Sequence, residues 1–165
     1  KGLDRLIPAL AEIPVGHLAV VGNDEEGYLL ELRRLAAARG VAERMTFLPR
    51  SVHGADKEHL FAAAKVFVLP SYSENFGNVV LEAMARGCPV VVTPEVGAAE
   101  VVRASGGGVV VAGDSPTLAR ALGSLIENPR RVEIGQQGQR YVRANFTWNG
   151  VAGQMEAVYR GQEGG

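Results

Sequence analysis

Two glutamates that stand eight residues apart carry the clearest chemical signal in this chain of 165 residues. Glu74 and Glu82 flank Phe76 and Gly77, and the apolar, β-branched run 66–69 leads into them. This order predicts a strand, a tight loop with one carboxylate, and a helix that begins at the glycine and carries the second carboxylate. In open α/β sheets, ligands bind beyond the carboxyl ends of the strands, where helix N-termini also point.

Glu82 lies in an otherwise apolar helical pattern, where a buried carboxylate needs an ion pair or hydrogen bonds. A polyhydroxyl ligand fits, because a carboxylate accepts two hydrogen bonds from a vicinal diol. The alternative partner is Arg86, which stands four residues further along the same helix, a spacing suited to ion pairs. Glu74 leaves a similar choice between a ligand contact and a solvated acid that the helix dipole favours.

The start of this helix offers backbone N–H groups, from Phe76 to Val79, that can bind a sugar hydroxyl or a phosphate oxygen. Gly77 permits close approach of a ligand because it has no side chain. Asn78 is suited either to cap the helix or to contact the ligand, and the ring of Phe76 is suited to packing.

Elsewhere, short β-branched runs alternate with longer helical patterns, which is typical of βαβ units and predicts an α/β domain with a parallel sheet. Strands are expected at 18–21, 46–48, 66–69, 90–92 and 109–111. Helices are expected at 3–11, 26–39, 57–63, 78–85, 98–103, 115–127, 131–145 and 151–160. Gly40 is expected to end the second helix, Ser115 to cap the helix at 115–127, and residues 53–56 to form a surface loop.

Composition limits the function classes. A hydrophobic content of 47% with 21% charged residues is typical of a globular domain, and the formal net charge of -1 gives no bulk attraction to nucleic acid. The single cysteine, Cys88, excludes an intramolecular disulfide and is expected to be a packed thiol. The scattered histidines predict no metal site. With no visible signal peptide and no apolar run near ~20 residues, we expect a cytoplasmic location.

Further motifs occur in order along the chain: Lys1-Gly2-Leu3-Asp4-Arg5-Leu6-Ile7, Val20-Val21-Gly22-Asn23-Asp24, Phe47-Leu48-Pro49, Pro70-Ser71, Glu82-Ala83-Met84-Ala85, Gly87-x-Pro89-Val90-Val91, Gly97 to Glu100 and Phe146-Thr147-Trp148. Together with the two glutamates, this set resembles the retaining, nucleotide-sugar-dependent glycosyltransferases of family 4 (group 1). The resemblance covers nearly the whole chain. It implies a Rossmann-like three-layer domain with a parallel sheet of about five or six strands, one lobe of the two-lobed B-type fold.

The resemblance also implies roles for individual residues in binding a nucleotide-sugar donor. Glu82 would bind the ribose hydroxyls, and Glu74 would bind the hexose and act in catalysis by stabilising developing positive charge. Lys1 would neutralise the diphosphate. The remaining donor-binding positions are Gly22, Ser51, Val52, Phe76, Gly77, Asn78 and Val79, with the backbone near Ser51 and Val52 meeting the base.

Two departures from the family pattern affect this assignment. Val96 stands where the family commonly has the first glycine of Gly-Gly-x-x-Glu, which weakens a diphosphate contact there, although Gly97 is still expected to open a helix. Acidic residues follow Asn23 where the family often has a second glycine, which favours a plain turn after Gly22. Glu100 is interpreted as a structural helix acid.

The leading hypothesis is that residues 1–165 form the C-terminal donor-binding domain of a retaining glycosyltransferase. It would take a UDP- or GDP-sugar, need no cofactor, and depend on an absent N-terminal lobe for the acceptor site and for any peripheral membrane contact. The chain alone would then be inactive. The alternatives are a stand-alone nucleotide-binding or partner-docking module, and one lobe of a sugar-nucleotide epimerase.

Overall fold

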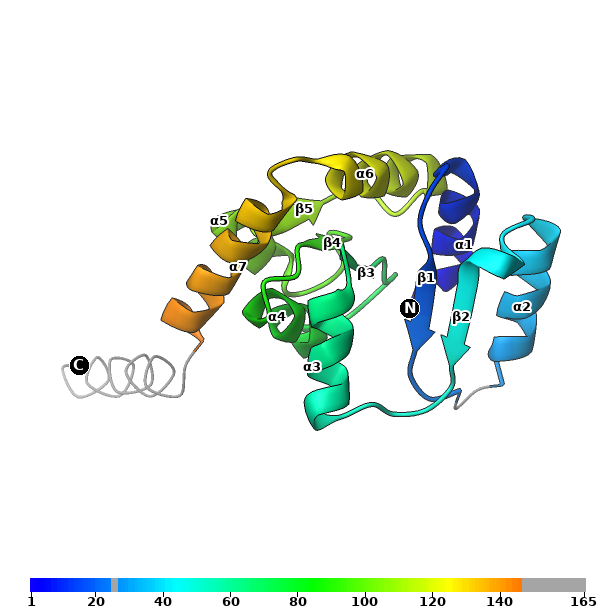
Figure 1. Ribbon diagram of the computed structural model, residues 1–165, viewed down its shortest axis with the longest axis horizontal. Helices are drawn as coiled ribbons and strands as arrows, with labels where there is room; N and C mark the ends of the chain where they lie inside the picture. Colours follow the sequence, from blue (N-terminus) through cyan, green and yellow to red (C-terminus); the bar gives the residue numbers. More distant parts are fainter. Residues whose placement is uncertain (25–26, 147–165) are drawn as a thin grey trace, which may run out of the picture.

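The computed structural model describes residues 1–24 and 27–146, which form an α/β domain (Figure 1). Its strands are β1 (Leu18–Val21), β2 (Met45–Leu48), β3 (Phe67–Leu69), β4 (Val90–Val92) and β5 (Gly108–Val110). Its helices are α1 (Leu3–Glu12), α2 (Leu29–Ala38), the short 3-10 helix η1 (Ala42–Arg44), α3 (Gly54–Ala63), α4 (Asn78–Ala85), α5 (Ala99–Ser105), α6 (Ser115–Glu127) and α7 (Arg131–Asn145).

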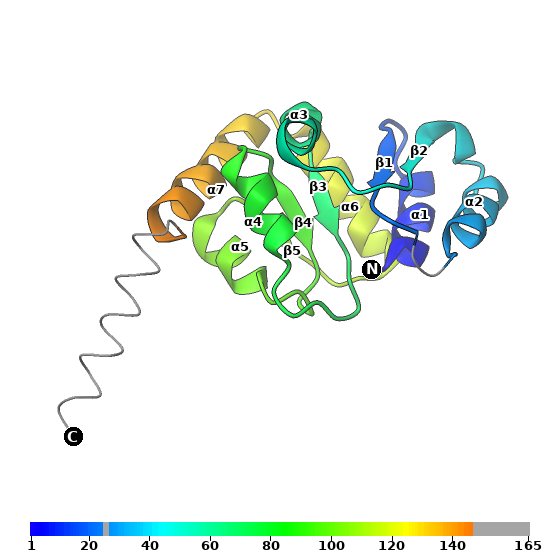
Figure 2. The same ribbon diagram turned by 90° about the horizontal axis from the view of Figure 1, so that it is seen from below.

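All pairing between these strands is parallel, and the hydrogen bonds form one sheet from β1 and β2 and another from β3, β4 and β5. In both views the two sheets lie side by side with β1 next to β3 (Figures 1 and 2). The five predicted strands and their parallel direction are confirmed. Among the described residues, no ladder of hydrogen bonds joins β1 to β3. Apolar side chains from both sides, such as Leu18, Val66 and Val68, pack against the same core cluster.

Strand β4 shows why the domain has three layers. Its residues Val90, Val91 and Val92 are all fully buried, as expected for a parallel strand with helices on both faces. Val90 and Val92 pack in a cluster that includes residues of α4 and α5, whereas Val91 packs in a cluster that includes residues of α1 and α6.

The chain order places the candidate site. From β1 the chain moves outward to β2, and it then returns past β1 to β3 and continues through β4 to β5 in the other direction (Figure 1). The reversal between β1 and β3 is a topological switch point, and ligands of open α/β sheets bind outside the carboxyl ends of the strands at such points. The loops that follow β1, β2 and β3 carry most of the predicted donor-binding residues.

Two local expectations are corrected. Residues 53–56 are not a surface loop, because α3 begins at Gly54 with His53 as its N-cap, and Asp56 suits the first turn of a helix. The cap of α6 is Asp114, whose Oδ1 accepts a hydrogen bond from the Thr117 N–H at 2.9 Å. Ser115 instead donates its hydroxyl to the Arg5 carbonyl oxygen at 2.8 Å.

Other local expectations are confirmed. Gly40 follows α2 in the left-handed region, with φ of +68°, and the predicted bounds of α4, α6 and α7 agree with the structure. Cys88 is a buried thiol, and burial raises its pKa to about 11. The predicted helix at 151–160, with Thr147 and Trp148, lies outside the described residues. Within the described ranges, no helix combines the length and apolar character needed to span a bilayer.

Candidate functional site

Helix α4 begins directly after the loop that follows β3, as the sequence predicts. Gly77 is the N-cap of α4 with φ of +81°, and a Cβ there would lie 3.1 Å from the Val96 side chain. The backbone N–H groups of Gly77, Asn78 and Val79 meet no acceptor among residues 1–24 and 27–146. Asn78 is the first residue of the helix and makes no capping hydrogen bond, so the capping interpretation of Asn78 is wrong. These N–H groups are therefore available to a ligand.

Backbone hydrogen bonds tie this loop to the segment 95–98. The Glu74 N–H donates to the Glu95 carbonyl oxygen at 3.1 Å, and the Gly97 N–H donates to the Glu74 carbonyl oxygen at 3.0 Å. A Cβ on Gly97 would lie only 2.0 Å from the Asn75 carbonyl oxygen, so glycine is required for the two segments to approach this closely.

Val96 and Gly97, which stand at the two glycine positions of the family's Gly-Gly-x-x-Glu pattern, therefore have structural roles. Gly97 does not open a helix, because α5 begins at Ala99 with Ala98 as its N-cap, and that expectation is corrected. Val96 is 1% exposed and packs in the core beside Gly77. Glu100 pairs with Arg103 on the surface of α5, as expected of a structural acid.

The start of α1 is fixed against the same loop. Gly2 has φ of +74°, and a Cβ there would lie 1.8 Å from the Pro70 carbonyl oxygen, so this close contact requires glycine. The Tyr72 hydroxyl donates to Asp4 Oδ2 at 2.5 Å. This docking brings the Lys1 ammonium into an ion pair with Glu74 Oε2. Two predicted site residues that are far apart in the sequence thus lie together, with the Glu74 side chain 20% exposed.

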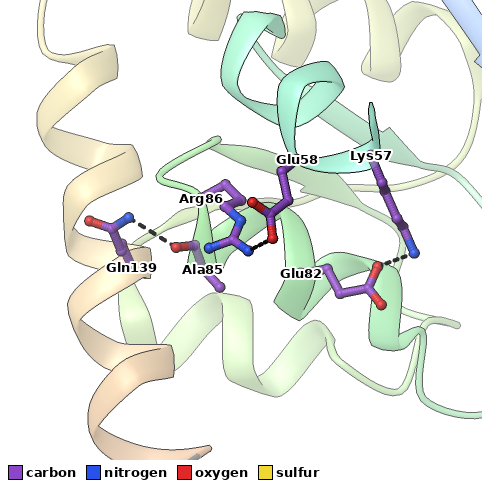
Figure 3. Close-up of polar contacts among 6 residues, drawn as sticks. All are labelled: Lys57, Glu58, Glu82, Ala85, Arg86 and Gln139. Atoms are coloured by element: carbon purple, nitrogen blue, oxygen red, sulfur yellow. Dashed lines mark hydrogen bonds and ion pairs between the residues drawn. The ribbon is translucent and has the colours of Figure 1, made fainter. Parts of the chain in front are cut away.

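Glu82 lies on the outer face of α4, and its side chain is 46% exposed. The premise that it is buried is wrong, because the buried face of this helix is formed by Val80, Ala83 and Met84. Glu82 pairs with Lys57 of α3 (Figure 3). The alternative pairing with Arg86 is also wrong, since Arg86 binds a different acid of α3, Glu58.

A cavity of about 400 Å³ lies between the end of β2 and α3. Its walls are Leu48, Arg50, Val52, Asp56, His59, Leu60 and Ala63. Beside it, the Ser51 hydroxyl donates to Asn23 Oδ1 at 3.1 Å, and the Gly22 N–H donates to the Leu48 carbonyl oxygen at 3.2 Å. The predicted positions Gly22, Ser51 and Val52 therefore gather at the carboxyl ends of β1 and β2.

Phe76, predicted to pack, is 38% exposed, and its ring lies 6.5 Å from that of Phe146 between centroids. A larger cavity of about 460 Å³ lies between α1 and the start of α6, away from the predicted site residues. Within the part of the chain that the structure describes, no group of three His, Cys, Asp or Glu side chains is placed to hold a metal ion.

Lys57 and Tyr72 were missed by sequence reasoning. Neither belongs to a motif, and each acts across elements: Lys57 contacts α4 from α3, and Tyr72 contacts α1 from the β3–α4 loop. The only available signal for Tyr72 was its place within the segment that also carries Glu74.

We compared the sequence and the fold of this chain with those of known proteins. The family model "Glycosyl transferases group 1" matches residues 1–141. The chain belongs to the group 1 glycosyltransferases. Among curated relatives of this glycosyltransferase chain, the D-inositol 3-phosphate glycosyltransferase of Salinispora tropica is 38% identical over 158 residues, covering 92% of this chain and 32% of that protein. The chain thus spans about a third of the length of the curated relatives it matches.

Solved structures show the same glycosyltransferase fold. Sucrose-phosphate synthase from Thermosynechococcus elongatus superimposes with a TM-score of 0.83 at 33% identity, covering 98% of this chain and 42% of that protein. Anabaena HepE in complex with UDP and glucose superimposes with a TM-score of 0.82 at 29% identity, covering 94% of this chain and 43% of that protein. Membership of the group 1 glycosyltransferases favours the transferase hypothesis over the epimerase alternative.

Proposed function

We propose that this chain is the C-terminal donor-binding domain of a retaining glycosyltransferase, which transfers a sugar from a nucleotide-diphosphate sugar to an acceptor hydroxyl. One observation carries the proposal. Glu74, its partner Lys1 and the free N–H groups of Gly77 to Val79 meet at the end of β3, beside the switch point of the sheet. A carboxylate for hydroxyl groups, a cation and a helix N-terminus for phosphate are the groups that such a donor requires.

Each part of the donor has a place along this edge. The cavity lined by Val52 also has the apolar side chains of Leu48, Leu60 and Ala63 in its walls, which suit a nucleobase. Glu82, on the adjacent face of α4, accepts hydrogen bonds from the ribose hydroxyls. The N–H groups of α4 and the Lys1 ammonium offset the diphosphate charge, and Glu74 contacts the hexose.

Uridine is the base we propose first. The Anabaena relative HepE has been solved with UDP and glucose and also with UDP-glucose, and it is 29% identical to this chain over 94% of this chain's length. Backbone N–H and C=O groups can form hydrogen bonds with more than one kind of base. GDP is therefore the comparison ligand in the test below.

Catalysis in this proposal needs a second lobe. Glu74 stabilises positive charge that develops at the anomeric carbon, while the other lobe supplies the acceptor and closes over the donor to exclude water. Alignment of donor with acceptor is lost without that lobe. The 165-residue chain is therefore expected to show no sugar transfer from UDP-glucose, and turnover by the purified chain would contradict this part of the proposal.

The test is calorimetric titration of the chain with UDP and GDP, repeated on Glu82→Ala. We expect one nucleotide to bind, and its affinity to fall at least tenfold, or ~1.4 kcal/mol, on substitution. Glu100→Ala is the matched control, because Glu100 is also an ion-paired surface acid at a helix and should leave affinity unchanged. Failure of both nucleotides to bind, in this chain and in one extended upstream, would overturn the proposal.

A second candidate is a partner-docking module. It is favoured by the exposed rings of Phe76, Phe146 and Tyr72, which lie near the proposed donor edge. A chain that self-associates through these rings would show a mass that rises with concentration in light scattering, and Phe76→Ser would suppress the rise. A constant monomer mass favours the donor domain.

A further inference from the structure

Helix α3 presents two different faces to the molecule. Asp56, His59, Leu60 and Ala63 line the cavity beside β2, and their spacing of three and four residues places them on one face. Lys57, Glu58 and Phe61 lie on another face, which meets α4 and the core. One helix therefore forms a wall of the proposed base cavity and also contacts the residue proposed to bind ribose.

Few contacts hold α3 in place. Phe61 is its only buried residue, whereas α4 buries three of its eight residues. Two neighbouring ion pairs complete the contact between α3 and α4 (Figure 3). In one, the base Lys57 of α3 pairs with Glu82, and in the other, the acid Glu58 of α3 pairs with Arg86. Of these two ion pairs, only Lys57–Glu82 involves a predicted donor-binding residue.

Lys57 can hold Glu82 without blocking it. The ammonium contacts one carboxylate oxygen, Oε2, and a carboxylate has about four lone-pair sites on its two oxygens. Oε1 and the second lone pair of Oε2 stay available to hydroxyl groups. A glutamate held in this way is partly ordered before the ligand arrives, so less rotamer freedom is lost when the ligand binds.

We propose that Lys57 is a positioning residue of the nucleoside site. It orients the Glu82 carboxylate toward the ribose diol and, through α3, sets that carboxylate relative to the wall of the base cavity. This inference rests on the proposed function, because it assigns a partner to the ribose-binding glutamate. The proposed role of Lys57 concerns only the binding of the two secondary ribose hydroxyls. Substitution of Lys57 should therefore not change the affinity for a nucleotide that lacks them.

The experiment is a set of calorimetric titrations with UDP and with 2′,3′-dideoxy-UDP, on the unaltered chain and on Lys57→Met, Lys57→Arg and Glu58→Gln. Lys57→Met should weaken UDP binding about three- to tenfold, because the Glu82 carboxylate must then be ordered when the ligand binds. It should change dideoxy-UDP binding less than about twofold. Lys57→Arg, which keeps a donor and a charge, should recover most of the UDP affinity.

Glu58→Gln is the matched control. It breaks the neighbouring α3–α4 ion pair on the same helix without touching Glu82, and it should leave both affinities unchanged. Equal losses for UDP and dideoxy-UDP in Lys57→Met would show a general effect on the fold or on charge, and would overturn the proposal. Tighter UDP binding by Lys57→Met would also overturn it, because Lys57 would then compete with the ribose.

The same data separate this inference from the function on which it rests. If Glu82→Gln weakens UDP binding and Lys57→Met does not, the ribose role of Glu82 stands and the role of Lys57 fails. If the unaltered chain binds UDP and dideoxy-UDP equally, the ribose assignment fails and the positioning role fails with it. If it binds neither, the titrations are repeated on a chain extended upstream, and failure there overturns the proposed function together with this inference.

Discussion

The two carboxylates of the proposed donor edge are held by different kinds of contact. Glu74 lies in a loop fixed by backbone hydrogen bonds to segment 95–98 and by the close approach of Gly97 to Asn75. Glu82 faces a helix with one buried residue and is held by a partly exposed ion pair with Lys57. Backbone contacts leave few alternative conformations, whereas exposed ion pairs contribute only about 0–1 kcal/mol and weaken with salt.

This difference corresponds to the parts of the donor that the two sites would bind. The proposed hexose site, at Glu74, is the more rigid of the two, as expected where an anomeric carbon must be placed accurately. The proposed nucleoside site, between α3 and α4, is held by the weaker, partly exposed contacts. Three measurements test this contrast.

The largest effect is expected from Gly97→Ala in the rigid region. The new methyl group would lie 2.0 Å from the Asn75 carbonyl oxygen, so two backbone segments must separate. We expect a loss of about 3 kcal/mol in the free energy of unfolding, measured by urea denaturation. Gly123→Ala in α6 is the control, since a methyl group there meets nothing within 4 Å and should stabilise by about 0.5–1 kcal/mol. Equal effects at the two glycines would refute the close-approach argument.

An intermediate effect is expected at Cys88, whose thiol lies 3.8 Å from the carbonyl oxygen of Ala64, the residue after α3. Burial raises the pKa of this thiol to about 11, so the unfolded chain loses the proton at lower pH than the folded one. Stability is therefore complete below the unfolded pKa and falls as the pH rises from about 9 to about 11, by up to about 1.4 kcal/mol per pH unit. Urea denaturation across this range should show a shallower fall for Cys88→Ala. Parallel curves would show that the thiol titrates alike in both states.

The smallest effect is expected from the Glu58–Arg86 ion pair. Both side chains are about half exposed, so a double-mutant cycle with Glu58→Gln and Arg86→Met should give a coupling below about 1 kcal/mol. The coupling should shrink further in 0.5 M salt, where charges are screened within a few ångströms. A coupling that is large and insensitive to salt would mean that α3 is as firmly held as the Glu74 loop.

Local sequence patterns predicted most of the secondary structure. The run Val90–Val92 is apolar throughout because helices cover both faces of β4, and Gly77 predicted the start of α4 because it adopts the left-handed region there. The start of α3 was missed because its first helical turn contains Gly54 and Asp56, residue types that are also common in surface loops. The interpretation of Glu82 as buried failed because apolar neighbours in sequence do not define which face of a helix points inward. Its partner Lys57 comes from another helix, a pairing that only the tertiary arrangement determines.

The division of the strands into two hydrogen-bonded groups has a consequence for cooperativity. The unit of β1, α2 and β2 carries Gly22, Ser51 and Val52, whereas the unit of β3, β4 and β5 carries Glu74 and Glu82. Cooperative opening units often coincide with such supersecondary groups, so the two groups are expected to differ in amide-exchange protection. A nucleotide that contacts both groups of strands would stabilise each of them against separate opening. Its binding would therefore make the amide-exchange protection of the two groups more nearly equal.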